Sequence, residues 1–411
     1  MQVRSACRIC GYPLTHTFVD LGVSPLANSF IAPDGLERPE PFYPLRAHVC
    51  DRCFLVQLEE FETPQRIFSD YAYLSSFSEE WLEHSQRFAD MAVGRFGLKE
   101  TSQVIEVASN DGYLLQYFHA KGIPVLGIEP AENVASEAIA RGIPTRTVFF
   151  DADTSRALRS SGYGADLLIA NNVLGHVPDL HSFVAGLETI LKPRGALTLE
   201  FPHFLRLLEG IEFDTIYHEH LSYFSLANVE RLFEHHGLLV YDVEELPTHG
   251  GSLRIYARHE EDDSKPIESS VTALRQKEQH AGLHRLETYA AFQDKVISVK
   301  CDLLDFLIRQ RRDGKHVAGY GAPAKGNTLL NYCGIGPELL AYTVDRNPRK
   351  QGCYLPGSRI PIYCPERIAE TRPDYVLILP WNLRREVSRQ LAFVCDWGGR
   401  FVVPIPALEV F

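Results

Sequence analysis

Tyr217, His218, Glu219 and His220 stand side by side in the stretch TIYHEHLSYFS, and all four side chains handle protons or bind metals. A neutral imidazole, whose ordinary pKa is about 6.5, can accept a proton near neutral pH. A neighbouring carboxylate can fix its tautomer, and a phenol can donate a hydrogen bond to an oxyanion. If the segment is extended, the two histidines share one face and could ligate a metal. No third ligand lies at suitable spacing, so we favour acid/base chemistry.

A second group of reactive side chains is formed by cysteines. Cys7 and Cys10 make one C-x-x-C pair, and Cys50 and Cys53 make another. Two such pairs can supply four thiolates to one tetrahedral zinc ion. Because protein ligands would then fill every position, the zinc is expected to be structural rather than catalytic. The other five cysteines are isolated and are expected to be ordinary thiols.

The segment SQVIEVASNDGYLLQYFHAKGIPVLGIEP predicts a strand, a tight turn at 109–112, a short helix and a second strand that ends in an acid, Glu129. In doubly wound sheets an acid at this place accepts hydrogen bonds from ribose hydroxyls. The turn lacks the G-x-G-x-x-G pattern of dinucleotide sites and carries the acids Glu106 and Asp111. Carboxylates repel phosphate but suit a sulfonium and an amino group, which favours S-adenosylmethionine (SAM) over NAD. The structural alternative is that Glu106 is a strand-end charge and Asp111 a helix cap.

The pattern continues with a strand over 166–170, the amides Asn171 and Asn172, a helix from about Leu180 and a strand over 196–201. His176 lies in the loop after the third strand, where parallel sheets form their binding crevice; packing on Pro178 is the alternative. The residues expected to bind SAM are Glu106, Ser109, Asn110, Asp111, Gly112, Tyr113, Leu114, Glu129, Pro130, Asn171, Asn172 and His176.

Composition narrows the class of protein. The chain has 411 residues, 45% of them apolar, which suggests two or three domains. Its formal charge of −12, and a net charge of −3 in the first 70 residues, argue against a nucleic-acid binder, although a zinc module in an RNA-interaction protein is the alternative. No long uncharged apolar run and no signal-peptide pattern occur, so we expect a cytoplasmic protein without a membrane span.

Together these motifs resemble a known family. C-R-I-C with C-D-R-C, DYAYLSSFSEEW, EVASNDGYLLQ, GIEPAENVA, ANNVLGHVPDL, YHEHLSYFS, HGGSLR and GYGAPAKGNTLL are similar to the zinc-containing, SAM-dependent sugar C-methyltransferases of antibiotic deoxysugar biosynthesis, of the tetronitrose and mycarose type. The resemblance covers essentially the whole chain. It implies that His220 is the base or its partner, with Tyr217 and Glu219 beside it, His176 facing the sugar, and Tyr71 reaching in from the zinc module. The residues expected to contact the substrate are Tyr73, Ser75, His218, Lys325 and Asn327.

The last part of the chain predicts a second Rossmann-like unit. The acidic stretch EEDDSKPIESS reads as a boundary, and one long packing helix is expected over 271–312. KHVAGYGAPAKGNTLLNY then gives a strand, a glycine loop and a helix, with a further strand ending at Asp345. Lys325 in that loop could meet a phosphate. A nucleotide-sugar site, a pure scaffold and an NAD(P)H site for a second, ketoreductase activity all stay open.

We therefore predict an α/β protein with three domains: a zinc-binding module over 1–70, a doubly wound SAM-dependent methyltransferase domain over 71–262, and a long helix with a Rossmann-like domain over 263–411. The expected reaction is methyl transfer from SAM to C3 of a TDP-linked 4-keto-deoxysugar, through an enolate formed by a His/Tyr base. A C5-methyltransferase, a bifunctional enzyme that also reduces the C4 ketone, and a nicotinamide-dependent oxidoreductase are the alternatives. The chain is expected to be a monomer.

Overall fold

The computed structural model describes residues 6–68 and 74–411. Its contacts divide the chain into two compact units, each made of three segments that alternate along the sequence. Unit 1 comprises residues 1–15, 50–205 and 221–284, and unit 2 comprises residues 16–49, 206–220 and 285–411. In the described part of the chain, no helix combines the length and the apolar composition that a bilayer crossing requires.

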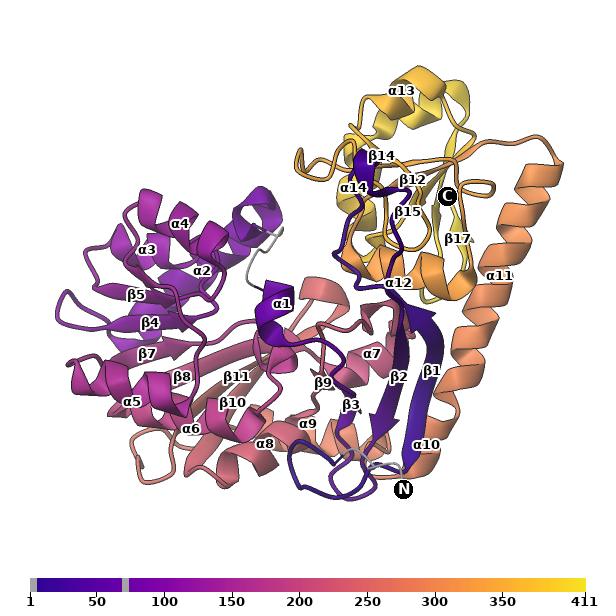
Figure 1. Ribbon diagram of the computed structural model, residues 1–411. Helices are drawn as coiled ribbons and strands as arrows, with labels where there is room; N and C mark the ends of the chain where they lie inside the picture. The colour runs from indigo at the N-terminus through magenta and orange to yellow at the C-terminus, as the bar shows by residue number, and fades with distance from the viewer. Residues whose placement is uncertain (1–5, 69–73) are drawn as a thin grey trace. The chain divides into compact units, whose positions relative to one another are not determined.

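Unit 1 is built around a seven-stranded sheet of order β10-β11-β8-β7-β4-β5-β6 (Figure 1). The strands of unit 1 are β3 Val56–Leu58, β4 Val104–Val107, β5 Val125–Ile128, β6 Thr145–Arg146, β7 Ala165–Ile169, β8 Leu191–Pro202, β9 Ser222–Tyr223, β10 Leu238–Leu246 and β11 Ser252–His259. From β6 to β8 all neighbours are parallel, whereas β11 is antiparallel to both β8 and β10. This arrangement confirms the doubly wound domain expected from the alternating strand and helix motifs.

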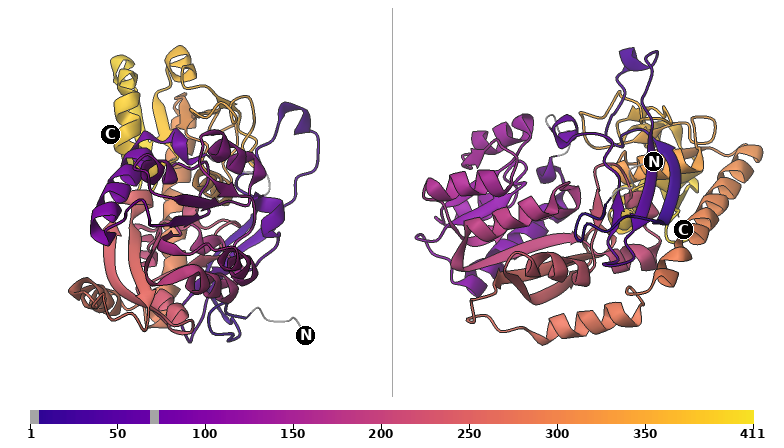
Figure 2. Two further views of the ribbon diagram at one scale, coloured as in Figure 1. Left: turned by 90° about the vertical axis from the view of Figure 1, so that its left-hand side faces the viewer. Right: turned by 60° about the horizontal axis from the view of Figure 1, so that its bottom comes forward.

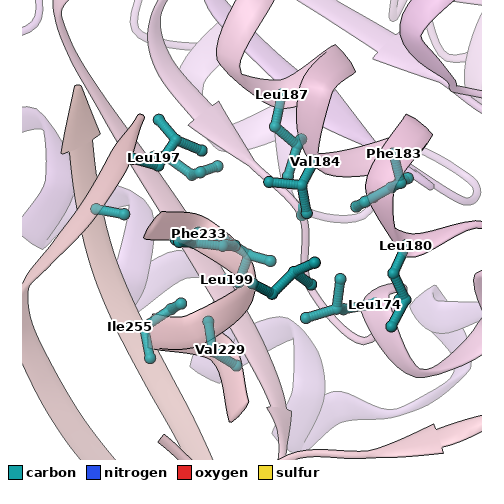
Figure 3. Close-up of a cluster of buried hydrophobic side chains, with 14 of the residues drawn as sticks. Leu174, Leu180, Phe183, Val184, Leu187, Leu197, Leu199, Val229, Phe233 and Ile255 are labelled. Carbon is teal, nitrogen blue, oxygen red and sulfur yellow. The ribbon is translucent and has the colours of Figure 1, made fainter. Parts of the chain in front are cut away.

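Helices cover both faces of this sheet. The helices of unit 1 are α1 Pro64–Phe68, α2 Glu79–Phe96, α3 Leu115–His119, α4 Glu132–Ala140, α5 Ala152–Ser160, α6 Leu180–Ile190, α8 Leu226–Glu234 and α9 Ser269–His280, and α7 Phe204–Gly210 begins in unit 1 and ends in unit 2. Side chains of α2, α3 and α4 form the core on one face, and those of α5, α6, α8 and α9 form the core on the other. Figure 3 shows part of the second core, where Val184 and Leu187 of α6 face Leu197 and Leu199 of β8.

Unit 2 contains a six-stranded sheet of order β14-β13-β12-β15-β16-β17. The strands of unit 2 are β1 His16–Ser24, β2 Tyr43–Val49, β12 Val317–Tyr320, β13 Thr343–Val344, β14 Ile362–Tyr363, β15 Tyr375–Ile378, β16 Arg400–Val403 and β17 Glu409–Val410. Its helices are α10 Leu286–Ala290, α11 Phe292–Arg312, α12 Ala324–Cys333, α13 Arg367–Thr371 and α14 Arg384–Gln390. Within the six-stranded sheet all pairs except β16 with β17 are parallel, which confirms the Rossmann-like domain.

The prediction of a single long helix over 271–312 is wrong. Three helices, α9, α10 and α11, replace it. Gly282 adopts φ +79° just after α9, a left-handed conformation that ends a helix. The remaining helix α11 packs against the antiparallel β1–β2 hairpin, where the Phe18 and Phe292 rings stack with centroids 4.5 Å apart. Figure 2 gives two further views in which the hairpin and α11 can be followed.

Candidate active site and metal centre

The four predicted zinc ligands come together in unit 1. The Sγ atoms of Cys7, Cys10, Cys50 and Cys53 all lie within 4.8 Å of one another. Cys7 Sγ is 3.4 Å from Cys53 Sγ, and Cys10 Sγ is 3.5 Å from Cys50 Sγ. Tetrahedral zinc with Zn–S bonds of about 2.3 Å places its sulfurs about 3.8 Å apart, so the cluster fits zinc after small adjustments. Within the described residues this is the one group with metal-ligand spacing.

The surroundings of Cys7 favour its thiolate form. Gln57, which is fully buried, donates from Nε2 to Cys7 Sγ at 3.3 Å and accepts from the Arg8 N–H at 3.0 Å. Hydrogen bonds from Cys50 and Cys53 lower the pKa of the Cys7 thiol. Second-sphere donors of this kind orient metal ligands and stabilise their charge. Sequence reasoning missed Gln57, which lies four residues beyond the second C-x-x-C pair.

The zinc module is fastened to the methyltransferase sheet through α8. Asn228 in the first turn of α8 donates from Nδ2 to the Cys53 carbonyl at 2.6 Å, and Arg231 donates to the Arg52 carbonyl at 3.0 Å. Cys7, Cys50 and Cys53 belong to the same buried cluster as the apolar residues of α8. The zinc module therefore supports the fold of the SAM domain, as a structural metal site does.

The turn between β4 and α3 has the backbone of a ligand-binding loop. Ala108 and Asn110 adopt φ +56° and +48°, although neither is glycine. Gly112 adopts φ +77°, and a Cβ there would meet Ile143 Cγ1 at 3.0 Å, so glycine is required. Non-glycine residues in the left-handed region cost free energy and concentrate at functional sites. Ser75 fixes the turn, because its N–H donates to Asn110 Oδ1 at 2.9 Å.

The acceptors in this loop fit SAM. Ser109 Oγ, Asp111 Oδ1 and Asn171 Oδ1 are buried and have no hydrogen-bond partner among residues 6–68 and 74–411, and the buried Glu106 carboxylate is hydrogen-bonded to Tyr113. Buried polar atoms are nearly always paired, and the amino group and hydroxyls of SAM are donors. Burial raises the pKa of Glu106 well above its usual range, and the charges of Glu129 and Asp111 add to this effect. A cation bound beside these carboxylates would stabilise their charged forms.

Glu129 ends β5 as predicted and is 6% exposed. Its Oε2 accepts from the Asn110 N–H at 3.0 Å, and its Oε1 accepts from the Ala131 N–H at 2.9 Å. Burial raises its pKa, and these two backbone hydrogen bonds oppose the rise. The carboxylate thus joins the SAM loop to the start of α4, with lone pairs left for ribose hydroxyls. Leu114 is buried in the core, and Pro130, which follows Glu129 in the chain, is half-buried.

Asn171 and Asn172 follow β7 at the same edge of the sheet. Asn172 adopts φ +52°, and its N–H donates to the Glu200 carbonyl at 2.7 Å. His176 ends the short 3-10 helix Leu174–His176, and its ring lies 5.5 Å from that of Phe68, edge to face. The residues predicted to bind SAM thus lie at the carboxyl ends of β4, β5 and β7, which is where doubly wound sheets bind ligands.

Sequence reasoning missed a buried ion network on β8. Glu200, 1% exposed, contacts His84 Nε2 at 2.9 Å and accepts from Arg254 Nε at 2.8 Å. Arg254 belongs to the HGGSLR motif, whose His249 adopts φ +57° and lies 5.0 Å from the Trp81 ring. Glu200 is buried, so its carboxylate charge depends on stabilisation by the hydrogen bonds from His84 and Arg254.

The YHEH segment lies in unit 2 and is a turn rather than an extended strand. The His220 N–H donates to the Tyr217 carbonyl at 2.8 Å, so the first and fourth residues of the motif meet. Their rings lie 3.9 Å apart, and the Tyr217 hydroxyl is 2.7 Å from His220 Nε2. His220 Nδ1 is 2.8 Å from the Thr215 carbonyl, which only accepts, so Nδ1 carries a proton. Nε2 of neutral His220 is therefore the basic nitrogen, and Tyr217 donates to it.

The other two residues of the motif point elsewhere. Glu219, 3% exposed, accepts from Asn28 Nδ2 at 2.7 Å. His218 is 5% exposed; its Nε2 is 3.1 Å from the Pro44 carbonyl and its ring packs edge-on against Tyr43. Burial lowers the pKa of His218. The segment is a turn and not extended, so the condition under which the two histidines would share a face is not met, and no H-x-H metal group is found within the described residues.

Comparison with known proteins agrees with a zinc module, a methyltransferase domain and a C-terminal domain in this chain. Family models match a zinc binding domain at residues 7–68, a methyltransferase domain at 81–243 and a C-methyltransferase C-terminal domain at 247–406. The C-methyltransferase NovU of Streptomyces niveus is 36% identical over 404 residues, which cover 98% of this chain and 96% of NovU. The chain belongs to the zinc-containing, SAM-dependent C-methyltransferases. SAM and zinc are accordingly its cofactors.

Solved structures are similar over less than half of this C-methyltransferase. Magnesium protoporphyrin IX methyltransferase from Synechocystis with bound SAH matches at 16% identity, 43% coverage of this chain and 82% of its own, with a TM-score of 0.34. The CcbJ methyltransferase from Streptomyces caelestis matches at 12% identity, 43% and 89% coverage and a TM-score of 0.35.

The glycine loop of the C-terminal domain is already occupied by protein groups. Asp345 accepts from the Ala322 N–H at 2.7 Å, and Lys350 donates to the Ala322 carbonyl at 2.8 Å. A dinucleotide would place its pyrophosphate on these same backbone N–H groups. Asp345, the acid at the end of β13, thus holds a backbone N–H of this loop, as Glu129 does in the SAM loop. The nucleotide-sugar, scaffold and NAD(P)H interpretations of this loop stay predictions.

The remaining predicted substrate contacts lie on or near α12. Lys325 donates to Asn382 Oδ1 at 2.8 Å and lies 4.7 Å from the Trp381 ring centroid. Asn327, 1% exposed, donates to the Ala27 carbonyl at 2.6 Å. Their contacts with a nucleotide sugar stay predictions. Tyr71 and Tyr73 lie outside the described residues.

Proposed function

We propose that this C-methyltransferase transfers the methyl group of SAM to C3 of a TDP-linked 4-keto-deoxysugar, with His220 as the proton acceptor. The observation that carries the proposal is the Tyr217–His220 pair. Its hydroxyl-to-Nε2 distance of 2.7 Å and the Thr215 carbonyl on Nδ1 leave a histidine of fixed tautomer and a phenol in contact with it. A carbon acid next to a ketone needs a positioned base of this kind.

Methylation of carbon, unlike that of oxygen or nitrogen, requires a carbanion equivalent. When the proton on C3 leaves, the C–H electron pair enters the C3–C4 bond and charge develops on the ketone oxygen. SAM, when bound, supplies an electrophilic methyl group. The electron pair would then form the new C–C bond at C3 as the S–CH3 bond breaks and its electron pair returns to sulfur, so that S-adenosylhomocysteine leaves and the C4 carbonyl is restored.

The chain's own groups handle the proton and the charge. The proton passes to His220 Nε2, and the Tyr217 hydroxyl, 2.7 Å from that nitrogen, is a donor for the developing oxyanion. The resulting imidazolium keeps its Nδ1–H on the Thr215 carbonyl. A general base contributes roughly 10²–10⁴-fold to such a step. Donors to an enolate oxygen contribute about 10²–10³-fold each, and His176 is a further candidate for this role.

The chemistry of the SAM loop suits the same reaction. Glu106, Asp111 and Glu129 place three carboxylates around the cofactor position. They favour a sulfonium cation and offer nothing to an enolate, so they retain the reactive cofactor without quenching the nucleophile. A phosphate-bearing cofactor would be repelled.

The test uses SAM labelled with ¹³C in its methyl group and a panel of TDP-4-keto-deoxysugars that differ at C3. The expected product shows the ¹³C methyl on a quaternary C3, with the substrate's C3 proton lost. Label at C5 would support the alternative C5-methyltransferase. Tight binding of S-adenosylhomocysteine without transfer to any 4-keto sugar would overturn the proposal.

A further inference from the structure

The turn that carries the Thr215 carbonyl is itself held by a buried acid that the reaction does not use. The 3-10 helix Phe213–Thr215 is followed directly by the YHEH segment. Its Asp214 is fully buried, and Asp214 Oδ2 accepts from Trp381 Nε1 at 2.8 Å. Hydrogen bonds from the backbone N–H groups of Asp214 and Thr215 also reach this carboxylate. A buried carboxylate is costly unless nearby charges or hydrogen bonds stabilise it.

Lys325 provides part of the electrostatic stabilisation of Asp214. Its ammonium lies over the Trp381 ring, which bonds Asp214, and its charge acts on both Asp214 and Glu212. Burial raises the pKa of Asp214 to about 6 and that of Glu212 to about 7, and the attraction of Lys325 opposes both rises. Two acids and one cation thus share a buried site, so the Asp214 charge is costly even with its partners.

The same turn sets the geometry of the base. Thr215 donates from its N–H and its Oγ1 to the Glu212 carbonyl, at 3.1 and 2.7 Å. Its own carbonyl points at His220 Nδ1. Thr328 of α12 donates to the neighbouring Ile216 carbonyl at 3.3 Å. The side chain that anchors the middle of this turn is Asp214.

We propose that Asp214 is a positioning residue for the catalytic histidine: held by Trp381, it fixes the Phe213–Thr215 turn so that the Thr215 carbonyl keeps the proton of His220 on Nδ1. The inference rests on the proposed function, in which Nε2 must be the free nitrogen. Without the anchor, the carbonyl moves, the tautomer is no longer fixed and the Tyr217–His220 contact loosens. A displacement of about 1 Å at such a site can cost 10²-fold in rate.

The experiment compares Asp214→Asn, which keeps the size and removes the charge, with Trp381→Phe, which removes the N–H donor and keeps the ring over Lys325. Asp374→Asn is the matched control, because Asp374 pairs with the exposed Lys315 at 2.8 Å in the same unit. We expect kcat to fall about 10- to 100-fold in both test variants, with KM and S-adenosylhomocysteine affinity unchanged. The control should keep wild-type values.

Nitrogen NMR of ¹⁵N-histidine-labelled protein gives the readout that a general structural role would not move. The His220 signal, assigned by its loss in His220→Asn, should show the Nδ1–H tautomer in wild type and a mixture in both test variants. The unfolding temperature of Asp214→Asn should not fall, because a buried charge is removed. An unchanged His220 tautomer in both variants would overturn the inference, whether or not kcat falls. Wild-type turnover of His220→Asn would instead refute the base of the proposed function.

Discussion

Glu129→Ala tests the assignment of the SAM loop. Glu129 makes two charge-assisted hydrogen bonds, to the backbone N–H groups of Asn110 and Ala131 at 3.0 and 2.9 Å. Hydrogen bonds to charged groups contribute roughly 1.5–3 kcal/mol, and the ribose hydroxyls would add bonds to the same carboxylate. Loss of one such contribution corresponds to a rise in dissociation constant of about 10- to 150-fold.

The assay is calorimetric titration with S-adenosylhomocysteine, performed next to an unfolding curve for each variant. Glu129→Ala also leaves two backbone donors without acceptors, which costs about 1–3 kcal/mol of stability for each buried group. Glu129→Gln keeps the shape and one acceptor, so its affinity should lie between those of wild type and Glu129→Ala. Glu132→Ala, an exposed change in the first turn of α4, is the control. An unchanged dissociation constant in folded Glu129→Ala would refute the ribose assignment.

Two further predictions concern the metal and the buried acids. Cys7→Ala or Cys50→Ala should lower the zinc content by about one ion per chain and reduce soluble yield, because the module supports α8; full zinc content by elemental analysis in the double variant would contradict this. Burial raises the pKa of Glu212 from its usual 4.5 to about 7, so between these values the folded state keeps a proton that the unfolded state loses, and stability falls as pH rises through that window. Glu212→Gln should therefore be more stable than wild type at pH 8, by about 1–3 kcal/mol, and equally stable at pH 4; a loss of stability at pH 8 in denaturant titration would show that the Glu212 charge is favourable.

The parts of the site that rest on local patterns could be predicted from the sequence. Two C-x-x-C pairs identify four ligands because zinc accepts few other arrangements of thiolates. The strand, turn and acid pattern around Glu106 and Glu129 locates the SAM loop because parallel strands place their carboxyl ends together. The order of strands and helices was likewise enough to predict both sheets.

Contacts between distant segments could not be predicted. Trp381 meets Asp214 across 167 residues, and Asn28 meets Glu219 across 191, with no motif to pair them. The sequence left the conformation of the YHEH segment open, because the contact of Tyr217 with His220 depends on a turn and on the Thr215 carbonyl, which no motif indicates. The expected long helix is interrupted first at Gly282, just after α9, and again at Ala291, between α10 and α11.

Exchange of the substrate's C3 hydrogen tests the central claim most directly. With S-adenosylhomocysteine in place of SAM, the enzyme and a TDP-4-keto-deoxysugar in deuterium oxide report proton abstraction without methyl transfer. Wild type should exchange the C3 hydrogen, His220→Asn should be slower by roughly 10²-fold or more while still binding both ligands, and Tyr217→Phe should retain part of the rate. Exchange by His220→Asn at the wild-type rate, with Tyr217→Phe inactive, would contradict the account and make the phenol the base.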